Sequence, residues 1–357
     1  MYFMDYSKLL SKKENICSKI KNIDFNFDYK NYWTNSDFNS HSDTIFAGGD
    51  GSFNKIDYVN YCLYISGTVS YIQKTDGKIE ESISAWDSNI ILPYKYVQSR
   101  LSLYMLNMEL KIALWNLKNK NINYYLYDGS LYSLLVQTNN KFSINGENLE
   151  NIIFKYYELY GDEIKNKIFE EIDSNNINSS VELSNNLNFS EEEKIILEQL
   201  EYLILLSELL KYREKIVGVA KTSKMNIYFK DALIPDLAIF SKCKNSGYSK
   251  PLDLVDEKIN KNFYKNVEYF KKFGIDLKKL NYQFAKLDKN SGTLCITSFE
   301  DLDETFFSNL QKISVSNYPY ILKKSHEKVK IEKKEIEKFV KLLGIYEKSD
   351  RDSNLEY

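Results

Sequence analysis

Two hydrophobic, strand-like runs of this 357-residue chain contain the same tripeptide, Asp-Gly-Ser, at their ends. Residues 45–52 carry Asp50 and residues 122–130 carry Asp128. A carboxylate at the end of a buried strand is costly unless a cation lies against it. Two such carboxylates in one sheet would also repel each other, and a bound metal ion would relieve that repulsion. The repeated pattern therefore indicates metal-dependent phosphodiester chemistry.

Asp-Gly-Ser is also a common way for a strand to end in a turn, and for one copy alone that interpretation is the simpler one. Two copies shift the balance toward chemistry. Glu109 is the third candidate carboxylate, because it lies close to the apolar stripe of a helical segment, where acidic residues are unusual. Arg100 or Lys111 could neutralise it. Together the three carboxylates would form an oxygen-rich cluster suited to Mg²⁺ or Mn²⁺.

Two further residues could assist this chemistry. Lys221 ends a third apolar strand, where it could bind a phosphate oxygen or be an ordinary edge lysine. His326 is one of two histidines and is expected in a helix that begins near Pro319. The other, His41, lies in a polar loop and is expected to be inert.

Composition limits the class of protein. Hydrophobic content of 43% and aromatic content of 15% support a packed core of one large domain or two ordinary ones. The net charge of −2 means that nucleic acid would be held by local basic patches. Four scattered cysteines without a CxxC pair argue against zinc ribbons and disulfide frameworks. With no membrane-length apolar run and no signal-peptide pattern, we expect a soluble cytoplasmic protein.

Periodicity predicts an α/β fold in which a mixed sheet is flanked by helices and carries a helical insertion. Asp76-Gly77 predicts a hairpin, and Ser190 with Glu193 predicts a capping box. We expect a helical or extended segment at 1–44, a main domain at 45–332 and a C-terminal helix and tail at 333–357. The expected helices are 5–22, 97–119, 150–215 (the insertion, with a loop at 174–188) and 253–272. The expected strands are a first one ending at Asp50, then 58–73, 216–220, 226–230, 236–240, 293–297 and 311–316.

One competing motif overlaps the first carboxylate. Gly48-Gly49-Asp50-Gly51-Ser52 also matches the phosphate loop GGDG[ST] of lipid and NAD kinases. In those enzymes the loop leads into a helix, whereas the residues that follow here are rich in β-branched and aromatic side chains. A phosphate-loop kinase is therefore the second interpretation.

Taken in order, Asp50, Glu109, Asp128, Lys221 and His326 give the chain a resemblance to the NurA nuclease family. The resemblance spans about residues 45–332. Its landmarks are the two Asp-Gly-Ser strands, the helix with Glu109, the segment 218–223 and Tyr318-Pro319 before the histidine.

The resemblance implies a ribonuclease H-like core, a manganese-dependent DNA nuclease and a homodimer. It also implies a hexameric HerA-type translocase as partner, in the processing of DNA ends for recombinational repair. By position, Asp50, Glu109, Asp128 and His326 would bind the metal, with Lys221 contacting a phosphate oxygen.

Other side chains could hold the DNA. Tyr125 and Tyr127 could stack on unpaired bases. The lysines at 323, 324, 328, 330, 333 and 334 could follow the phosphate backbone or simply form a solvated helix face. A third interpretation is a non-catalytic adaptor that binds DNA or recruits a translocase, which the low net charge leaves open.

Overall fold

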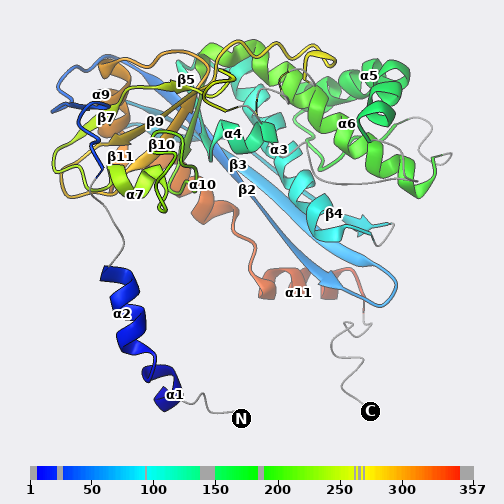
Figure 1. Ribbon diagram of the computed structural model, residues 1–357. Coiled ribbons are helices and arrows are strands. Elements are labelled where there is room, and N and C mark those ends of the chain that lie inside the picture. The colour runs from blue at the N-terminus through cyan, green and yellow to red at the C-terminus, as the bar shows by residue number, and fades with distance from the viewer. Residues whose placement is uncertain are drawn as a thin grey trace.

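A ten-stranded mixed sheet forms the centre of the structure, a computed structural model (Figure 1). The structure describes residues 6–21, 27–92, 95–136, 149–183, 189–260, 263, 267 and 270–345. The sheet confirms the predicted α/β class. Its strands run in the order β1-β7-β9-β10-β6-β5-β2-β3-β4, with β8 beside β9. They are β1 (Trp33–Asn35), β2 (Ile45–Asp57), β3 (Cys62–Lys74), β4 (Ile79–Ile91), β5 (Tyr124–Asp128), β6 (Ile216–Ala220), β7 (Gly247–Ser249), β8 (Leu252–Asp253), β9 (Asn281–Lys286) and β10 (Leu294–Ser298).

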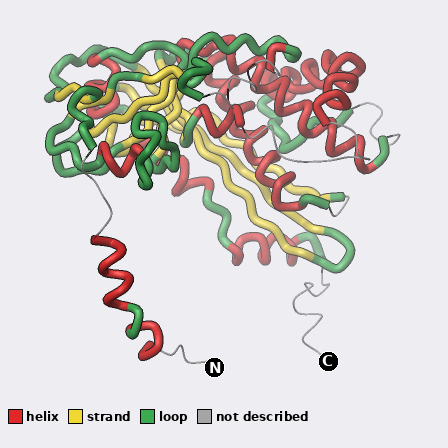
Figure 2. Tube along the Cα trace, viewed as in Figure 1, coloured by secondary structure: helices red, strands yellow, loops and turns green. Residues whose placement is uncertain are grey.

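Helices cover both faces of this sheet (Figure 2). One core cluster joins α3, α5 and α6 to the sheet, and a second joins α9 and α10 to its other face. The helices are α1 (Tyr6–Leu10), α2 (Lys13–Lys21), α3 (Val97–Asn119), α4 (Leu131–Val136), α5 (Leu149–Ser174), α6 (Glu191–Leu209), the 3₁₀ helix η3 (Leu210–Lys215), α7 (Asp236–Phe240), α9 (Glu304–Lys312), α10 (Tyr320–Val329) and α11 (Lys333–Leu342). A small hairpin pairs β11 (Ser314–Val315) with β12 (Tyr318–Pro319).

The centre of the sheet is parallel. Strand β5 pairs in parallel with β2 on one side and with β6 on the other, whereas the remaining pairs are antiparallel. The carboxyl ends of β5 and β6 therefore open at the same edge of the sheet. Polar side chains at this edge can meet, as they do in other open α/β sheets.

The first strand was expected to end at Asp50, and this expectation was wrong. Strand β2 continues to Asp57 and pairs along its whole length with β3, so that both extend from the body as a long arm (Figure 1). The β-branched residues of β3 also pair with β4, and cross-strand pairing of this kind extends a strand past a local turn signal. The predicted hairpin at Asp76-Gly77 is confirmed, with Gly77 at φ +92°.

Helix α3 and the helical insertion agree with the sequence pattern. Residues 97–119 form one helix, as predicted, and the insertion contains α5 and α6. The capping box of Ser190 and Glu193 is present at the start of α6. Residues 184–188 of the expected loop lie outside the described residues. In the N-terminal segment two short helices replace the single predicted one.

Several expected elements in the second half are different. Residues 226–230 form turns, because the buried Asp236 carboxylate accepts the backbone N–H groups of Ile227, Tyr228 and Phe229. A carboxylate that collects backbone donors gives those donors an alternative to a strand ladder. Residues 236–240 are helix α7 rather than a strand.

Other boundaries shift less. The strand expected at 293–297 is β10, but at 311–316 only Ser314–Val315 is extended. The expected helix at 253–272 instead begins with the last residue of β8 and turns through residue 259, and residues 261, 262, 264–266, 268 and 269 lie outside the described residues. No helix in the described parts of the chain is both long and apolar enough to span a membrane. The division of the chain at residues 44/45 and 332/333 stays a prediction.

We expect Glu198→Gln to destabilise the fold by about 3 kcal/mol, because it breaks a buried ion pair and leaves the Arg100 guanidinium without its counter-charge. The two side chains are 2.5 Å apart (Arg100 Nη2 to Glu198 Oε1) and only 2% and 7% exposed. Urea unfolding measures the change. The control is Glu191→Gln, whose partner Lys194 is on the surface and which should cost less than about 0.5 kcal/mol. Equal costs for both variants would contradict this account.

Candidate metal centre

Asp50 and Asp128 are neighbours across two parallel strands. The pairing of β2 with β5 matches Gly49 with Tyr127, so the next residues on the two strands are the two aspartates. Strand β5 ends there, while β2 continues for seven more residues. The repeated Asp-Gly-Ser pattern thus marks the point at which β2 loses its parallel neighbour. From Asp50 onward, that edge of β2 is free for other groups.

The Asp50 carboxylate has two close partners. Its Oδ1 accepts the backbone N–H of Gly51 at 2.9 Å, and its Oδ2 is 2.7 Å from Nδ1 of His326 on α10. Burial raises the pKa of Asp50, and repulsion from Asp128 raises it further, although the contact with His326 partly offsets both effects. The structure therefore brings together three of the residues singled out in the sequence.

Glu109 approaches from the opposite face of the sheet. A Cβ atom added to Gly51 would lie 2.5 Å from Oε1 of Glu109, so the glycine lets the α3 carboxylate lie against β2. Burial raises the pKa of Glu109 well above its usual range, followed by repulsion from Asp50 and then from Asp128. The two basic residues that could have neutralised it are engaged elsewhere.

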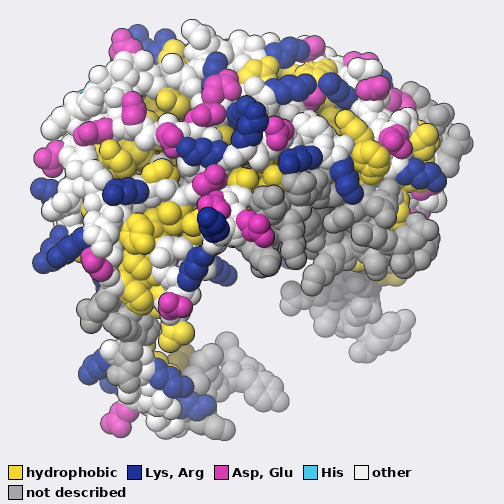
Figure 3. All heavy atoms as spheres, turned by 45° about the horizontal axis from the view of Figure 1, so that its top comes forward, with side chains coloured by type: hydrophobic (Ala, Val, Ile, Leu, Met, Phe, Trp, Pro, Cys, Tyr) yellow, Lys and Arg dark blue, Asp and Glu magenta, His cyan; other side chains and the backbone are white. Residues whose placement is uncertain are grey.

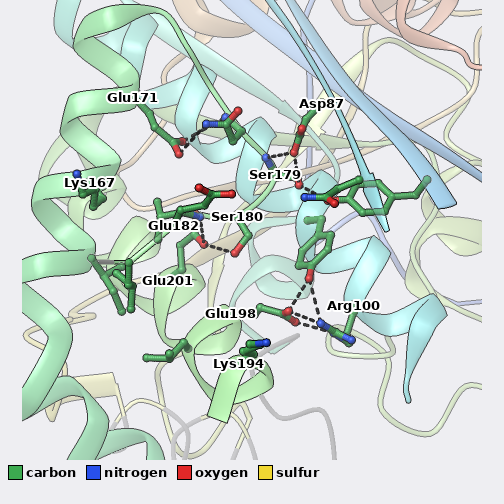
Figure 4. A pocket seen from close by; sticks show the side chains of 18 of the residues that line it. Asp87, Arg100, Lys167, Glu171, Ser179, Ser180, Glu182, Lys194, Glu198 and Glu201 are labelled. Carbon is green, nitrogen blue, oxygen red and sulfur yellow. Dashed lines mark hydrogen bonds and ion pairs between the residues drawn. The ribbon is translucent and has the colours of Figure 1, made fainter. Parts of the chain in front are cut away.

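Those two basic residues form ion pairs on another side of α3, and Arg100 also lines a cavity of about 630 Å³ there (Figure 4). Arg100 pairs with Glu198, and Lys111 pairs with Glu171 and Glu201 at 2.7 and 2.8 Å. Helix α3 thus presents its cations toward α5 and α6 and its Glu109 toward the strand ends. The cavity lies between the helical insertion on one side and β3, β4 and α3 on the other.

Asp128 is held by a residue that the sequence analysis used only as a landmark. The Tyr318 hydroxyl donates a short hydrogen bond to Oδ1 of Asp128. Burial, and then the charge of Asp128, raise the pKa of Tyr318, so it remains a donor. The β11–β12 hairpin aims this ring through a turn in which Ser316 and Asn317 both have positive φ, 56° and 64°.

Lys221 joins the same group through the Tyr318 ring. Its Nζ lies 3.8 Å from the ring centroid, a cation–π contact just beyond the end of β6. The signal that could have identified Tyr318 is its position directly before Pro319 and close to His326. Neither periodicity nor charge pattern marks it.

The donor chemistry of this cluster fits a hard divalent cation. In the described ranges, the only basic side chain that forms an ion pair with any of the three carboxylates is the His326 ring. Mutually repelling carboxylates are typical ligands of Mg²⁺ and Mn²⁺. Among the described residues, however, no three acidic, imidazole or thiolate groups are already gathered as a ligand set.

The remaining candidates lie outside the cluster. Tyr125 is only 3% exposed, so stacking of its ring on a DNA base was a wrong expectation, whereas Tyr127 is partly buried and its stacking stays a prediction. The kinase-like motif lies inside the continuous strand β2 and leads into no helix. It therefore cannot form a phosphate loop at a helix N-terminus. His41 is exposed, as expected.

We expect Gly51→Ala to weaken Mn²⁺ binding about 10- to 100-fold, because the added methyl group would displace Glu109 from the strand. Isothermal titration with Mn²⁺ measures the affinity. Gly292→Ala is the matched control, since a Cβ at that position meets nothing within 4 Å. Unchanged Mn²⁺ affinity in the Gly51 variant, with the fold intact, would contradict a role for Glu109 in the site.

Comparisons with known proteins point to one family over most of the chain. A model of the NurA domain family matches residues 44–331. A relative from Methanocaldococcus jannaschii, named as a probable DNA double-strand break repair nuclease NurA, is 40% identical, over 94% of this chain and 88% of its own. A NurA from Sulfolobus acidocaldarius is 28% identical over 73% of this chain and 69% of its own.

Solved structures show the same fold. The crystal structure of the NurA nuclease from Sulfolobus solfataricus matches with a TM-score of 0.71 and 20% identity, over 100% of this chain and 99% of that one. A crystal structure of NurA bound to dAMP and manganese matches with a TM-score of 0.61 and 15% identity, over 99% and 100% of the two chains.

Proposed function

The chain belongs to the NurA domain family, and on that premise we propose that it is a manganese-dependent nuclease that cleaves DNA. The observation that carries the proposal is the pair Asp50 and Asp128, which are neighbours across the parallel strands β2 and β5 and are coupled by their charges to Glu109. The name of the Methanocaldococcus relative and the manganese and dAMP in a solved NurA structure support it.

In this proposal Asp50, Glu109 and Asp128 hold the metal, with His326 completing the site. A bound divalent ion supplies Lewis acidity toward water and the scissile phosphate. The protein supplies the rest. His326 has its Nδ1 engaged by Asp50 while the side chain is 64% exposed, which leaves the other ring nitrogen either to bind the metal or to pass a proton to the leaving group.

Lys221 has the role of binding a non-bridging phosphate oxygen. Its contact with the Tyr318 ring holds the ammonium group near the end of β5, and no carboxylate in the described part of the chain forms an ion pair with it. The positive charge thus remains available for an anionic substrate. Tyr318 in turn keeps the Asp128 carboxylate oriented.

The finer functional assignments are also part of the proposal. We assign exonuclease and endonuclease cleavage of single- and double-stranded DNA, a homodimer and a hexameric HerA-type ATPase that feeds DNA during end resection in the cytoplasm. Charge supports the need for such a partner. Basic and acidic side chains are interspersed over the face in Figure 3, and the net charge is −2. The exposed lysines of α10 and α11 would hold DNA only locally.

Asp50→Asn should lower Mn²⁺-dependent cleavage of labelled DNA by at least about 100-fold, because metal ions contribute several kcal/mol to transition-state stabilisation. Asp57→Asn is the control, since Asp57 lies at the far end of the same strand and pairs with Lys55. Cleavage is followed on denaturing gels with single- and double-stranded substrates. Undiminished activity of the Asp50 variant would remove this residue from the mechanism.

Tyr318→Phe should lower kcat about 10- to 100-fold with little change in KM, because it removes the hydrogen bond to Asp128 but keeps the ring beneath Lys221. Tyr320→Phe, at the start of α10, is the control. A variant with wild-type kcat would show that Asp128 needs no support from this hydroxyl.

A further inference from the structure

Trp86 is a large apolar side chain left in contact with solvent on the arm. It lies on β4, the last strand of the sheet, and is 50% exposed. Its indole stands over Gly67 of β3, where an added Cβ would come within 2.3 Å of the ring atom Cε3. The missing side chain at Gly67 therefore creates the space in which the ring rests.

The ring lies on the same face of the sheet as the Asp50 carboxylate. Strand register aligns Ser52 with Gly67 and Gly67 with Trp86, and directly opposed residues point to one face. Asp50 is two residues before Ser52 and therefore shares that face. Trp86 is two strand spacings, about 10 Å, from β2, and its ring is turned back over β3 toward the site.

The neighbours of the ring leave it accessible. Ser84 and Ser88, two residues to either side on β4, are small and exposed. The paired residues Asp50, Val69 and Ser84 form a row across β2, β3 and β4. Trp86 lies on one side of this row, and on the other side Lys324 of α10 lies 4.5 Å from the ring centroid of Tyr71. Tyr71 pairs with Gly48 and so lies on this same face. A cation and an exposed indole thus lie on opposite sides of the row that contains Asp50.

We propose that Trp86 is a stacking platform for an unpaired base of the DNA strand whose phosphate lies at the Asp50 site. The assignment rests on the proposed nuclease function and adds a preference for a single-stranded segment beside the cleavage point. An indole face binds any base, whereas phosphates need the cations. A strand crossing this face would meet Lys324, then the carboxylates, then Trp86. Paired bases in a duplex would not offer their faces to the ring.

The binding test compares the full-length wild type with Trp86→Ala, Trp86→Phe and the matched control Ile90→Ala, which removes another exposed apolar side chain from β4. Fluorescence anisotropy with a labelled single-stranded oligonucleotide and its duplex is measured in EDTA at one salt concentration, so that no cleavage occurs. We expect Trp86→Ala to bind the single strand about 10- to 100-fold more weakly, with much less effect on the duplex. Trp86→Phe should keep most of the affinity, and Ile90→Ala should match the wild type.

An abasic scan locates the stacked base. Single abasic sites are placed one at a time along a cleavable strand, and KM is measured with Mn²⁺. An abasic site at one particular distance from the cut should raise the KM of the wild type. The same abasic site should leave the KM of Trp86→Ala unchanged.

Three outcomes would overturn the proposal: unchanged single-strand affinity of Trp86→Ala, an equal loss for duplex DNA, or a change of oligomeric state in sedimentation, which would make Trp86 a protein contact. Failure of the nuclease assignment appears separately, as absence of Mn²⁺-dependent cleavage by the wild type.

Discussion

Mutual repulsion of three carboxylates is the constraint around which the rest of this structure is arranged. Asp50 and Asp128 lie next to each other because β2 and β5 are parallel and Gly49 pairs with Tyr127, the residue before each aspartate. Glu109 brings a third carboxyl group from the opposite face, and burial together with the charges of the two aspartates raises its pKa. Isolated in water these groups would stay apart, and only a well-packed fold can hold them in a partly desolvated space. The energy for that comes from the core on both sides of the sheet.

Helix α3 shows how the fold meets this demand. One side of the helix carries Glu109 toward the strand ends, while its cations are held by carboxylates of α5 and α6. Buried ion pairs add little net stability, but breaking one is costly, so they define one arrangement of the helices. The helical insertion therefore acts as an anchor that keeps α3, and with it Glu109, against β2.

One face of the arm packs against the core, and the other carries the residues of the proposed substrate surface. One face of β2 and β3 packs on α3 and is closed by buried contacts such as the hydrogen bond from Asn116 to Ser70. The other face carries the Asp50–His326 contact, the cation of Lys324 and the exposed indole of Trp86. Because strand residues alternate between faces, a single 13-residue strand contributes both to the core and to the substrate surface.

From the sequence alone, local structure could be predicted where it depends on a local pattern. The helix at 97–119, the hairpin at Asp76-Gly77 and the capping box at Ser190 all follow from short-range periodicity and turn residues. Tertiary structure decided what depends on distant partners. Pairing with β3 carried β2 past Asp50, the Asp236 carboxylate turned residues 227–229 into a loop, and the β11–β12 hairpin brought Tyr318 to Asp128. Such contacts join residues far apart along the chain, and no local pattern records them.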